Sequence, residues 1–136
     1  MITNKYIKMC EKAEEIQKDW KPEDGDKYIY ILGKKREIVV WMYGDINSTW
    51  EEGCKLIWLP TQEQLQEISQ KEYSKSLKKS LVWFGYFVKF VRSKYQDDLI
   101  AHEYFNEMNE LWLAFLYDEK YHKIWTGEKW EEVKTK

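Results

Sequence analysis

The sequence predicts an α+β fold, because two kinds of hydrophobic pattern occupy different parts of the chain. Residues 27–43 are rich in β-branched and aromatic side chains around a short turn, which is typical of a β-hairpin. Residues 4–20 and most of the second half instead repeat apolar side chains at helical spacing. The length of 136 residues suits one hydrophobic core, so we expect residues 1–136 to form a single domain.

The first element is expected to be an amphipathic helix over residues 4–20. Ala13 and Ile16 belong to its apolar face, and charged side chains occupy the opposite face. A Pro-Glu-Asp-Gly stretch then ends the helix. Cys10 also lies on the apolar face, so we interpret it as a buried thiol and not as a nucleophile.

A small antiparallel sheet is expected next. Strands over residues 27–32 and 36–43 flank the turn at residues 33–35, which predicts a hairpin. Residues 54–59 are predicted to form a third strand that joins it. The loop over residues 44–53 carries three carboxylates and one tryptophan. Its spacing matches no calcium-loop pattern, so we interpret it as a solvated acidic loop.

The C-terminal half is predicted to contain two long packed helices. A Thr-x-x-Gln capping box begins a shorter helix over residues 61–72. The central long helix is predicted over residues 75–95, since its segment 81–91 contains a single charged residue. The last long helix is predicted over residues 97–122, with an apolar face that packs on the central helix.

The central helix is apolar around most of its circumference. Its non-apolar residues Lys78, Gly85, Lys89 and Arg92 fall on one narrow stripe. The unbroken apolar part is shorter than the roughly 20 residues that a membrane span needs, so we expect no membrane insertion. Two uses remain open: a buried central helix, or a helix that also forms a homodimer interface through residues 77–95.

Aromatic residues make up 17% of the chain, which is aromatic-rich for so charged a sequence. Most of these rings are expected to pack in the core. Trp41, Trp50, Trp125 and Trp130 lie in polar surroundings and are candidate interface anchors. Residues 121–133 are predicted to form a short β-turn unit in which Trp125 and Trp130 pair across the turn.

Composition and motifs exclude more functions than they support. A net charge of −2 argues against a general nucleic-acid or membrane-surface binder. The sequence has no Gly-rich phosphate loop and no nucleophile motif, so we expect neither an enzyme nor a cofactor. Cys10, Cys54, His102 and His122 share no metal-ligand spacing, so no metal site is expected. Without a secretory signal pattern, we expect reduced thiols and a cytoplasmic location.

Three blocks of the sequence occur together and carry a resemblance. They are Cys10–Gln17 with Trp20 and Gly25-Asp26, then Trp58–Glu67, and then Leu111–Phe115 with Glu119–Tyr121, Trp125, Gly127 and Trp130. In these blocks the chain resembles a family of small uncharacterised phage and prophage proteins of low-GC Gram-positive bacteria. The resemblance covers nearly the whole chain and is weakest between residues 70 and 100. It implies a viral gene product in the cytoplasm of a bacterial host, and it carries over no functional residues.

We therefore expect a non-catalytic protein-binding module, an accessory protein that binds a host or phage protein during host takeover or against a defence system. Tryptophan beside acidic residues in two turns carries this hypothesis, because Trp is enriched at interface anchors. The candidate binding residues are Trp50, Glu51, Glu52, Trp125 and Trp130.

Two alternatives use other residues. A small-ligand binder would use the exposed aromatic rings. A nucleic-acid-binding phage protein would use the basic stripe around the central helix, since phosphate contacts need clustered cations. That stripe consists of Lys75, Lys78, Lys79, Lys89 and Arg92.

Overall fold

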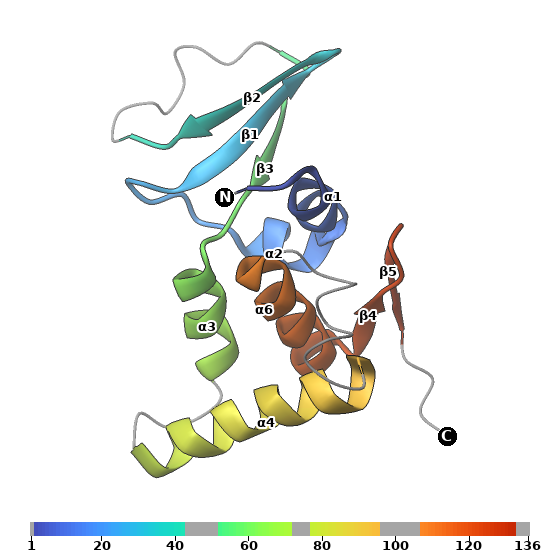
Figure 1. The fold of residues 1–136 in the computed structure, drawn as a ribbon. Helices are drawn as coiled ribbons and strands as arrows, with labels where there is room; N and C mark the ends of the chain where they lie inside the picture. The colour runs from blue at the N-terminus through green and yellow to red at the C-terminus, as the bar shows by residue number, and fades with distance from the viewer. Residues whose placement is uncertain (1, 43–51, 72–76, 96–106, 133–136) are drawn as a thin grey trace. The chain divides into compact units, whose positions relative to one another are not determined.

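The computed structural model describes residues 2–42, 52–71, 77–95 and 107–132 (Figure 1). For residues 77–81 and 92–95, it describes the backbone alone. The chain divides into two compact units, an N-terminal unit of residues 2–60 and a C-terminal unit of residues 61–136. The α+β class is confirmed, whereas the expected single domain stays a prediction.

The N-terminal unit begins with two helices where one was predicted. α1 spans Asn4–Lys12 and α2 spans Glu14–Asp19. The Thr3 side chain caps α1 by accepting a hydrogen bond from the N–H of Tyr6 at 2.9 Å. The continuous helix over residues 4–20 is wrong at Ala13, whose φ of −85° and ψ of 67° are not helical. The buried Ala13 is thus a corner of the backbone between the two helices.

Three antiparallel strands follow, and they confirm both the hairpin and the third strand. β1 spans Lys27–Leu32, β2 spans Lys35–Val40 and β3 spans Lys55–Trp58, in the order β2-β1-β3. Gly33 adopts a φ of 59° in the turn, a conformation that glycine accepts without a Cβ clash. β2 ends at Val40, before the predicted end of the second strand at residue 43.

Both faces of this sheet are partly covered. Tyr28 and Tyr30 point to one face, where they form a cluster with the buried Trp41. Ile29 and Ile57 point to the opposite face and are buried as well. Neighbouring residues of a strand alternate between faces, so β1 is apolar on both sides.

The C-terminal unit opens with two helices close to their predicted bounds. α3 spans Gln62–Gln70 and begins at the predicted capping box, in which Thr61 and Gln64 bond each other's backbone N–H. α4 spans Leu77–Tyr95 (Figure 1). In the part of the chain that the structure describes, no helix is long and apolar enough to cross a membrane.

The remaining elements are shorter than predicted. They are α6 (Met108–Leu116), the π-helix η1 (Tyr117–Tyr121), β4 (Lys123–Trp125) and β5 (Trp130–Glu132). The single helix over residues 97–122 is wrong within its described part, because Glu107 is extended with a φ of −135° and α6 begins after it. Its predicted start, at residues 97–98, lies outside the described residues.

Stacked rings build the core of the C-terminal unit. The Phe87 ring of α4 stacks on Trp112 of α6 with centroids 3.9 Å apart, and Phe115 contacts Phe87 edge-on at 5.3 Å. The Trp83 indole lies 5.2 Å from Trp112 and donates a hydrogen bond to the Ser69 hydroxyl at 3.0 Å. These contacts confirm that the last helix packs on the segment 81–91.

Candidate functional site

The predicted binding residues come from both units. Trp50 and Glu51 lie outside the described residues. Glu52 is exposed in a turn of the N-terminal unit, whereas Trp125 and Trp130 belong to the β4–β5 pair of the C-terminal unit. The structure therefore gives geometry for three of the five predicted anchors.

The predicted pairing of Trp125 with Trp130 is confirmed. The two residues are partners in the β4–β5 ladder, with ring centroids 5.1 Å apart. Trp130 also stacks on Tyr117 at 4.3 Å. Trp125 is only 7% exposed, so it offers little surface to a partner, and Trp130 is half-buried. Trp41, another candidate anchor, is buried on the sheet, which contradicts its expected polar surroundings.

Of the basic stripe predicted for nucleic-acid binding, the structure describes the side chain of one residue. Lys89 is exposed on α4, close to the exposed Gly85. Lys75 lies outside the described residues, and the side chains of Lys78, Lys79 and Arg92 are not described. The geometry therefore supplies no specific support for a nucleic-acid site.

The two thiols differ in their environments. Cys10 is fully buried, and desolvation by burial raises the pKa of its thiol despite an opposing hydrogen bond with Tyr6. Cys54 is half-buried and also free. Among the described residues, no group of three His, Cys, Asp or Glu side chains is placed to hold a metal ion. A buried, protonated thiol fits a structural role, as predicted for Cys10.

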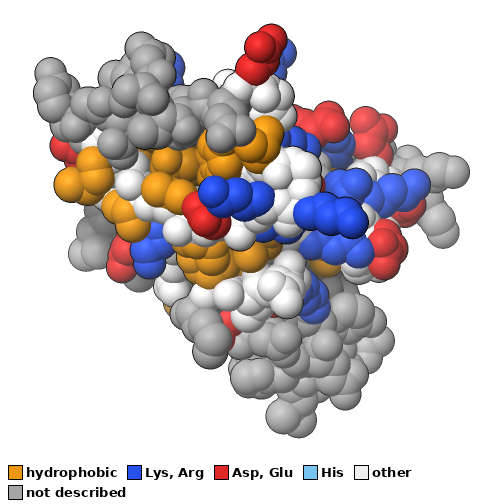
Figure 2. Space-filling view, turned by 90° about the horizontal axis from the view of Figure 1, so that it is seen from above, with side chains coloured by type: hydrophobic (Ala, Val, Ile, Leu, Met, Phe, Trp, Pro, Cys, Tyr) orange, Lys and Arg blue, Asp and Glu red, His pale blue; other side chains and the backbone are white. Residues whose placement is uncertain are grey.

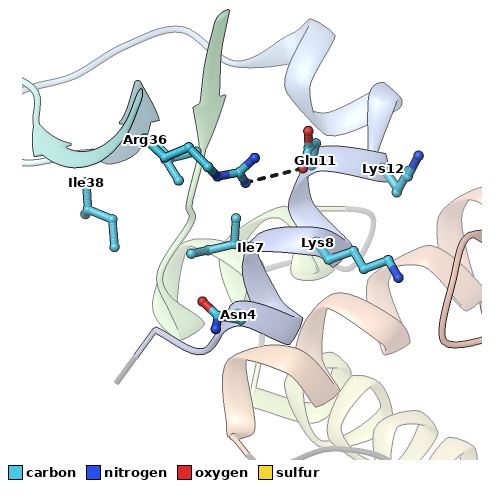
Figure 3. A pocket seen from close by; sticks show the side chains of 8 residues that line it. Asn4, Ile7, Lys8, Glu11, Lys12, Arg36 and Ile38 are labelled. Carbon is cyan, nitrogen blue, oxygen red and sulfur yellow. Dashed lines mark ion pairs between the residues drawn. The ribbon is translucent and has the colours of Figure 1, made fainter. Parts of the chain in front are cut away.

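A hollow of about 640 Å³ lies between α1 and the hairpin, within the N-terminal unit. Ile7 of α1 and Ile38 of β2 project toward each other across it (Figure 3), and the buried Ile29 of β1 also lines it. Its lining residues are Asn4, Ile7, Lys8, Glu11, Lys12, Ile29, Arg36 and Ile38. The hollow thus combines three isoleucines with five polar or charged side chains.

An exposed apolar strip borders the hollow along β2. It consists of Ile38, Val40 and Met42, which are 50%, 43% and 57% exposed. Seen from above in Figure 2, hydrophobic side chains gather into a patch with Lys and Arg side chains beside it. Exposed large apolar side chains are ordinary when single, but two on β2 and a third just after it indicate an interaction surface.

Within the described part of the chain, the backbone of the same strand has peptide groups that do not bond β1. The N–H of Trp41 donates to the Asp26 carbonyl, and the N–H of Leu59 donates to the Lys27 carbonyl at 2.8 Å. The peptide groups of Lys27 thus point toward β3. Lys27 and its partner Val40 in β2 therefore form a non-hydrogen-bonded pair. Such positions alternate along a strand, so Val40, Ile38 and Arg36 direct N–H and C=O away from β1.

We call Arg36, Ile38 and Val40 the β2 edge. In their register, Ile38 lies opposite Ile29 and Arg36 lies opposite Ile31, so these side chains share the face of the hollow. Val40 lies two residues after Ile38 and faces the same way. Each residue of the β2 edge therefore presents a side chain beside the hollow and a peptide group to the outside.

The opposite edge of the sheet is covered in another way. Gln17 of α2 accepts a hydrogen bond from the Trp58 N–H at 2.7 Å and donates to the Trp58 carbonyl at 2.9 Å. These two groups are the outward-facing pair of β3, because Trp58 lies opposite Tyr28 and the bonded positions alternate. The described residues contain no counterpart of Gln17 at the β2 edge.

Positive charge dominates the walls of the hollow. The lining includes three cations, Lys8, Lys12 and Arg36, and a single carboxylate, Glu11, which pairs with Arg36 at 3.6 Å. Glu11 also lies 4.0 Å from Lys55, so its one charge is shared. The two lysines extend from α1 on the side away from Ile38 (Figure 3). An acidic segment would therefore be attracted to the lining of this hollow, where three cations stand against one carboxylate, although the whole chain is weakly acidic.

Sequence reasoning missed this site, although a signal was present. Residues Ile38 to Met42 form an unbroken apolar run. A strand that is apolar at every position suits the middle of a buried sheet. Its place at an edge of the sheet leaves one side without cover, and strand order is not contained in a local pattern.

Comparisons with protein-family models, with curated proteins and with solved structures find no match to this chain. Any function therefore has to be inferred from the geometry and from the sequence itself.

Proposed function

We propose that this protein is a non-catalytic protein-binding module that binds its partner at the β2 edge and the adjoining hollow. The observation that carries the proposal is the exposed strip of Ile38 and Val40 on β2, continued by Met42 just after the strand, and β2 has one neighbouring strand among the described residues. An apolar strand edge invites pairing and aggregation, and proteins commonly blunt such edges with charge or cover. Charged side chains occupy the hairpin end of β2, whereas Ile38 and Val40 leave the other end apolar, and a partner at that end would explain it.

The proposed setting is the cytoplasm of a bacterial host that carries a phage or prophage. The resemblance in the three sequence blocks supports this setting, and the partner would be a host or phage protein. Trp50, Glu51 and Glu52 stay predicted contacts within the same unit. The homodimer through residues 77–95 also stays a prediction.

The test is a comparison of variants in affinity capture from a lysate of a low-GC Gram-positive bacterium. Asp at Ile38 and Val40 together should lower recovery of a specific partner at least about tenfold, equivalent to roughly 1.4 kcal/mol of binding free energy. The matched control is Met108→Asp, since Met108 is 47% exposed in the other unit and should leave recovery unchanged.

Circular dichroism should show both variants folded, because all three positions are at least 43% exposed. Equal recovery of every captured protein by the wild type and the double variant would refute the β2 edge as the binding surface. Loss with Met108→Asp alone would move the site to the C-terminal unit.

A further inference from the structure

We infer that the partner binds as an extended segment that adds a fourth, antiparallel strand to the sheet beside β2. Apolar side chains of that segment lie against Ile38 and Val40, and acidic side chains lie against the basic end of the hairpin. This inference rests on the proposed function and names the kind of partner that the same surface takes.

The backbone of the β2 edge favours a strand over a helix as the occupant. Arg36, Ile38 and Val40 direct their N–H and C=O groups outward at every second residue. An added strand presents its own peptide groups with the same two-residue repeat, so it can bond all of them. A helix bonds its peptide groups internally and would leave the β2 edge unpaired.

The side chains of the β2 edge define one face of the added strand. Directly opposed side chains in an antiparallel pair lie about 4.5–5.5 Å apart. Alternate residues of the segment would therefore pack on Ile38 and Val40 and cover their exposed surface. They would also extend the apolar wall of the hollow in front of Ile7 and Ile29.

For a segment that runs antiparallel to β2, charge fixes the order of its residues. Lys34, Lys35 and Arg36 are consecutive at the hairpin end of β2, and the apolar strip lies at the other end. Two carboxylates partly offset them: Glu37 pairs with Lys35 at 3.7 Å, and Glu11 of α1 pairs with Arg36 at 3.6 Å. An antiparallel segment passes Val40 first and the cations last, so it should carry apolar residues before acidic ones.

A second copy of β2 fits this edge less well than an acidic segment. Two copies paired antiparallel about Ile38 would bring Arg36 of one copy opposite Val40 of the other. The same pairing sets Lys34 against Met42. Cations would then lie on the apolar strip, and no carboxylate would face them.

The test uses the full chain, labelled with ¹⁵N, and two synthetic peptides of equal composition. The first is acetyl-Thr-Val-Thr-Val-Thr-Glu-Thr-Glu-amide, and the second has the same residues in reverse order. At millimolar concentration, the first should slow amide hydrogen exchange of Arg36, Ile38 and Val40 at least about tenfold. Exchange of Lys35, Glu37 and Val39 should change less than about twofold, because their N–H groups already bond β1.

A pair of variants isolates the backbone contribution. Val40→Pro and Val40→Thr both remove the valine side chain, and only the proline also removes the outward N–H. Proline is tolerated at such an outward position of an edge strand. Peptide affinity should fall at least about tenfold further with Val40→Pro than with Val40→Thr.

Each other outcome overturns a stated part of the inference. Equal protection by the reversed peptide would refute the direction. Chemical-shift changes at Ile7 and Ile38 without protection of the β2 edge would refute strand addition and leave the proposed function standing. The absence of any change with either peptide would refute the inference, while lysate capture still decides the proposed function. Protection that grows with protein concentration alone would assign the edge to a second copy.

Discussion

Each of the two units is stabilised internally by a different kind of interaction. In the N-terminal unit, polar side chains of the helices bond the backbone near β3: the Tyr6 hydroxyl donates to the Pro60 carbonyl at 2.6 Å, and Gln17 bonds Trp58 twice. In the C-terminal unit, Phe87 and Phe115 surround Trp112 with ring contacts. The first unit should therefore be sensitive to lost hydrogen bonds, and the second to lost volume.

The two units also expose apolar side chains in different contexts. Val82, Phe84 and Tyr86 are exposed on α4, as Ile38 and Val40 are on β2. The peptide groups of α4 are bonded within the helix, so a partner there gains side-chain burial alone. A partner on β2 gains burial and directional hydrogen bonds together. This difference is why we assign binding to β2 and keep the α4 homodimer as a prediction.

The largest expected effect comes from removing the central ring of the C-terminal unit. Trp112→Ala should lower the free energy of unfolding by about 3–5 kcal/mol, because a buried Trp leaves a large cavity and loses its stacked neighbours. Urea unfolding followed by circular dichroism measures this change.

The matched control is Phe84→Ala on the exposed side of α4. Phe84 is 52% exposed, so its loss should change the unfolding free energy by less than about 0.5–1 kcal/mol. Similar losses for the two variants would show that ring stacking on Trp112 does not hold this unit together.

A smaller effect is expected from the polar anchor of the N-terminal unit. Gln17→Ala removes both partners of the Trp58 backbone and should lower the unfolding free energy by about 2–4 kcal/mol, at roughly 1–2 kcal/mol for each part-buried group left unsatisfied. Lys18→Ala is the control, because Lys18 is exposed on the same helix. A loss below about 0.5 kcal/mol for Gln17→Ala would indicate that water replaces the amide.

Local patterns in the sequence were sufficient for most elements. The hairpin turn at Gly33, the capping box at Thr61 and the pairing of Trp125 with Trp130 all depend on residues close together in the chain. Signals of this kind act through turn conformation, end-group hydrogen bonds and direct opposition of side chains. They do not require knowledge of the tertiary structure.

The predictions from sequence were wrong or incomplete where tertiary structure overrides the local pattern. Ala13 is a strong helix former, yet it forms the break between α1 and α2, and its buried side chain lies at that corner. Trp41 was expected at a surface because of its neighbours, but it packs on Tyr28 of the sheet. The β2 edge was missed for the same reason, since its exposure depends on strand order and on which edge Gln17 covers.

The smallest expected effect is on the reactivity of the two thiols in the N-terminal unit. Substituting either thiol should change which cysteine reacts and leave the fold unchanged. Cys10 is fully buried and its raised pKa keeps it protonated, whereas Cys54 is half-buried beside the sheet. The Cys54→Ser variant should fold and keep Cys10 as its one thiol. At mildly alkaline pH, Cys10 should react with a disulfide reagent at least about 100-fold more slowly in the folded protein than in denaturant, because the reaction requires local opening. The reciprocal Cys10→Ser variant should keep the faster rate of Cys54. Rapid labelling of Cys10 in the folded Cys54→Ser protein would mean that α1 opens readily from β3, and the wall of the hollow would then be too mobile to serve as a preformed binding surface.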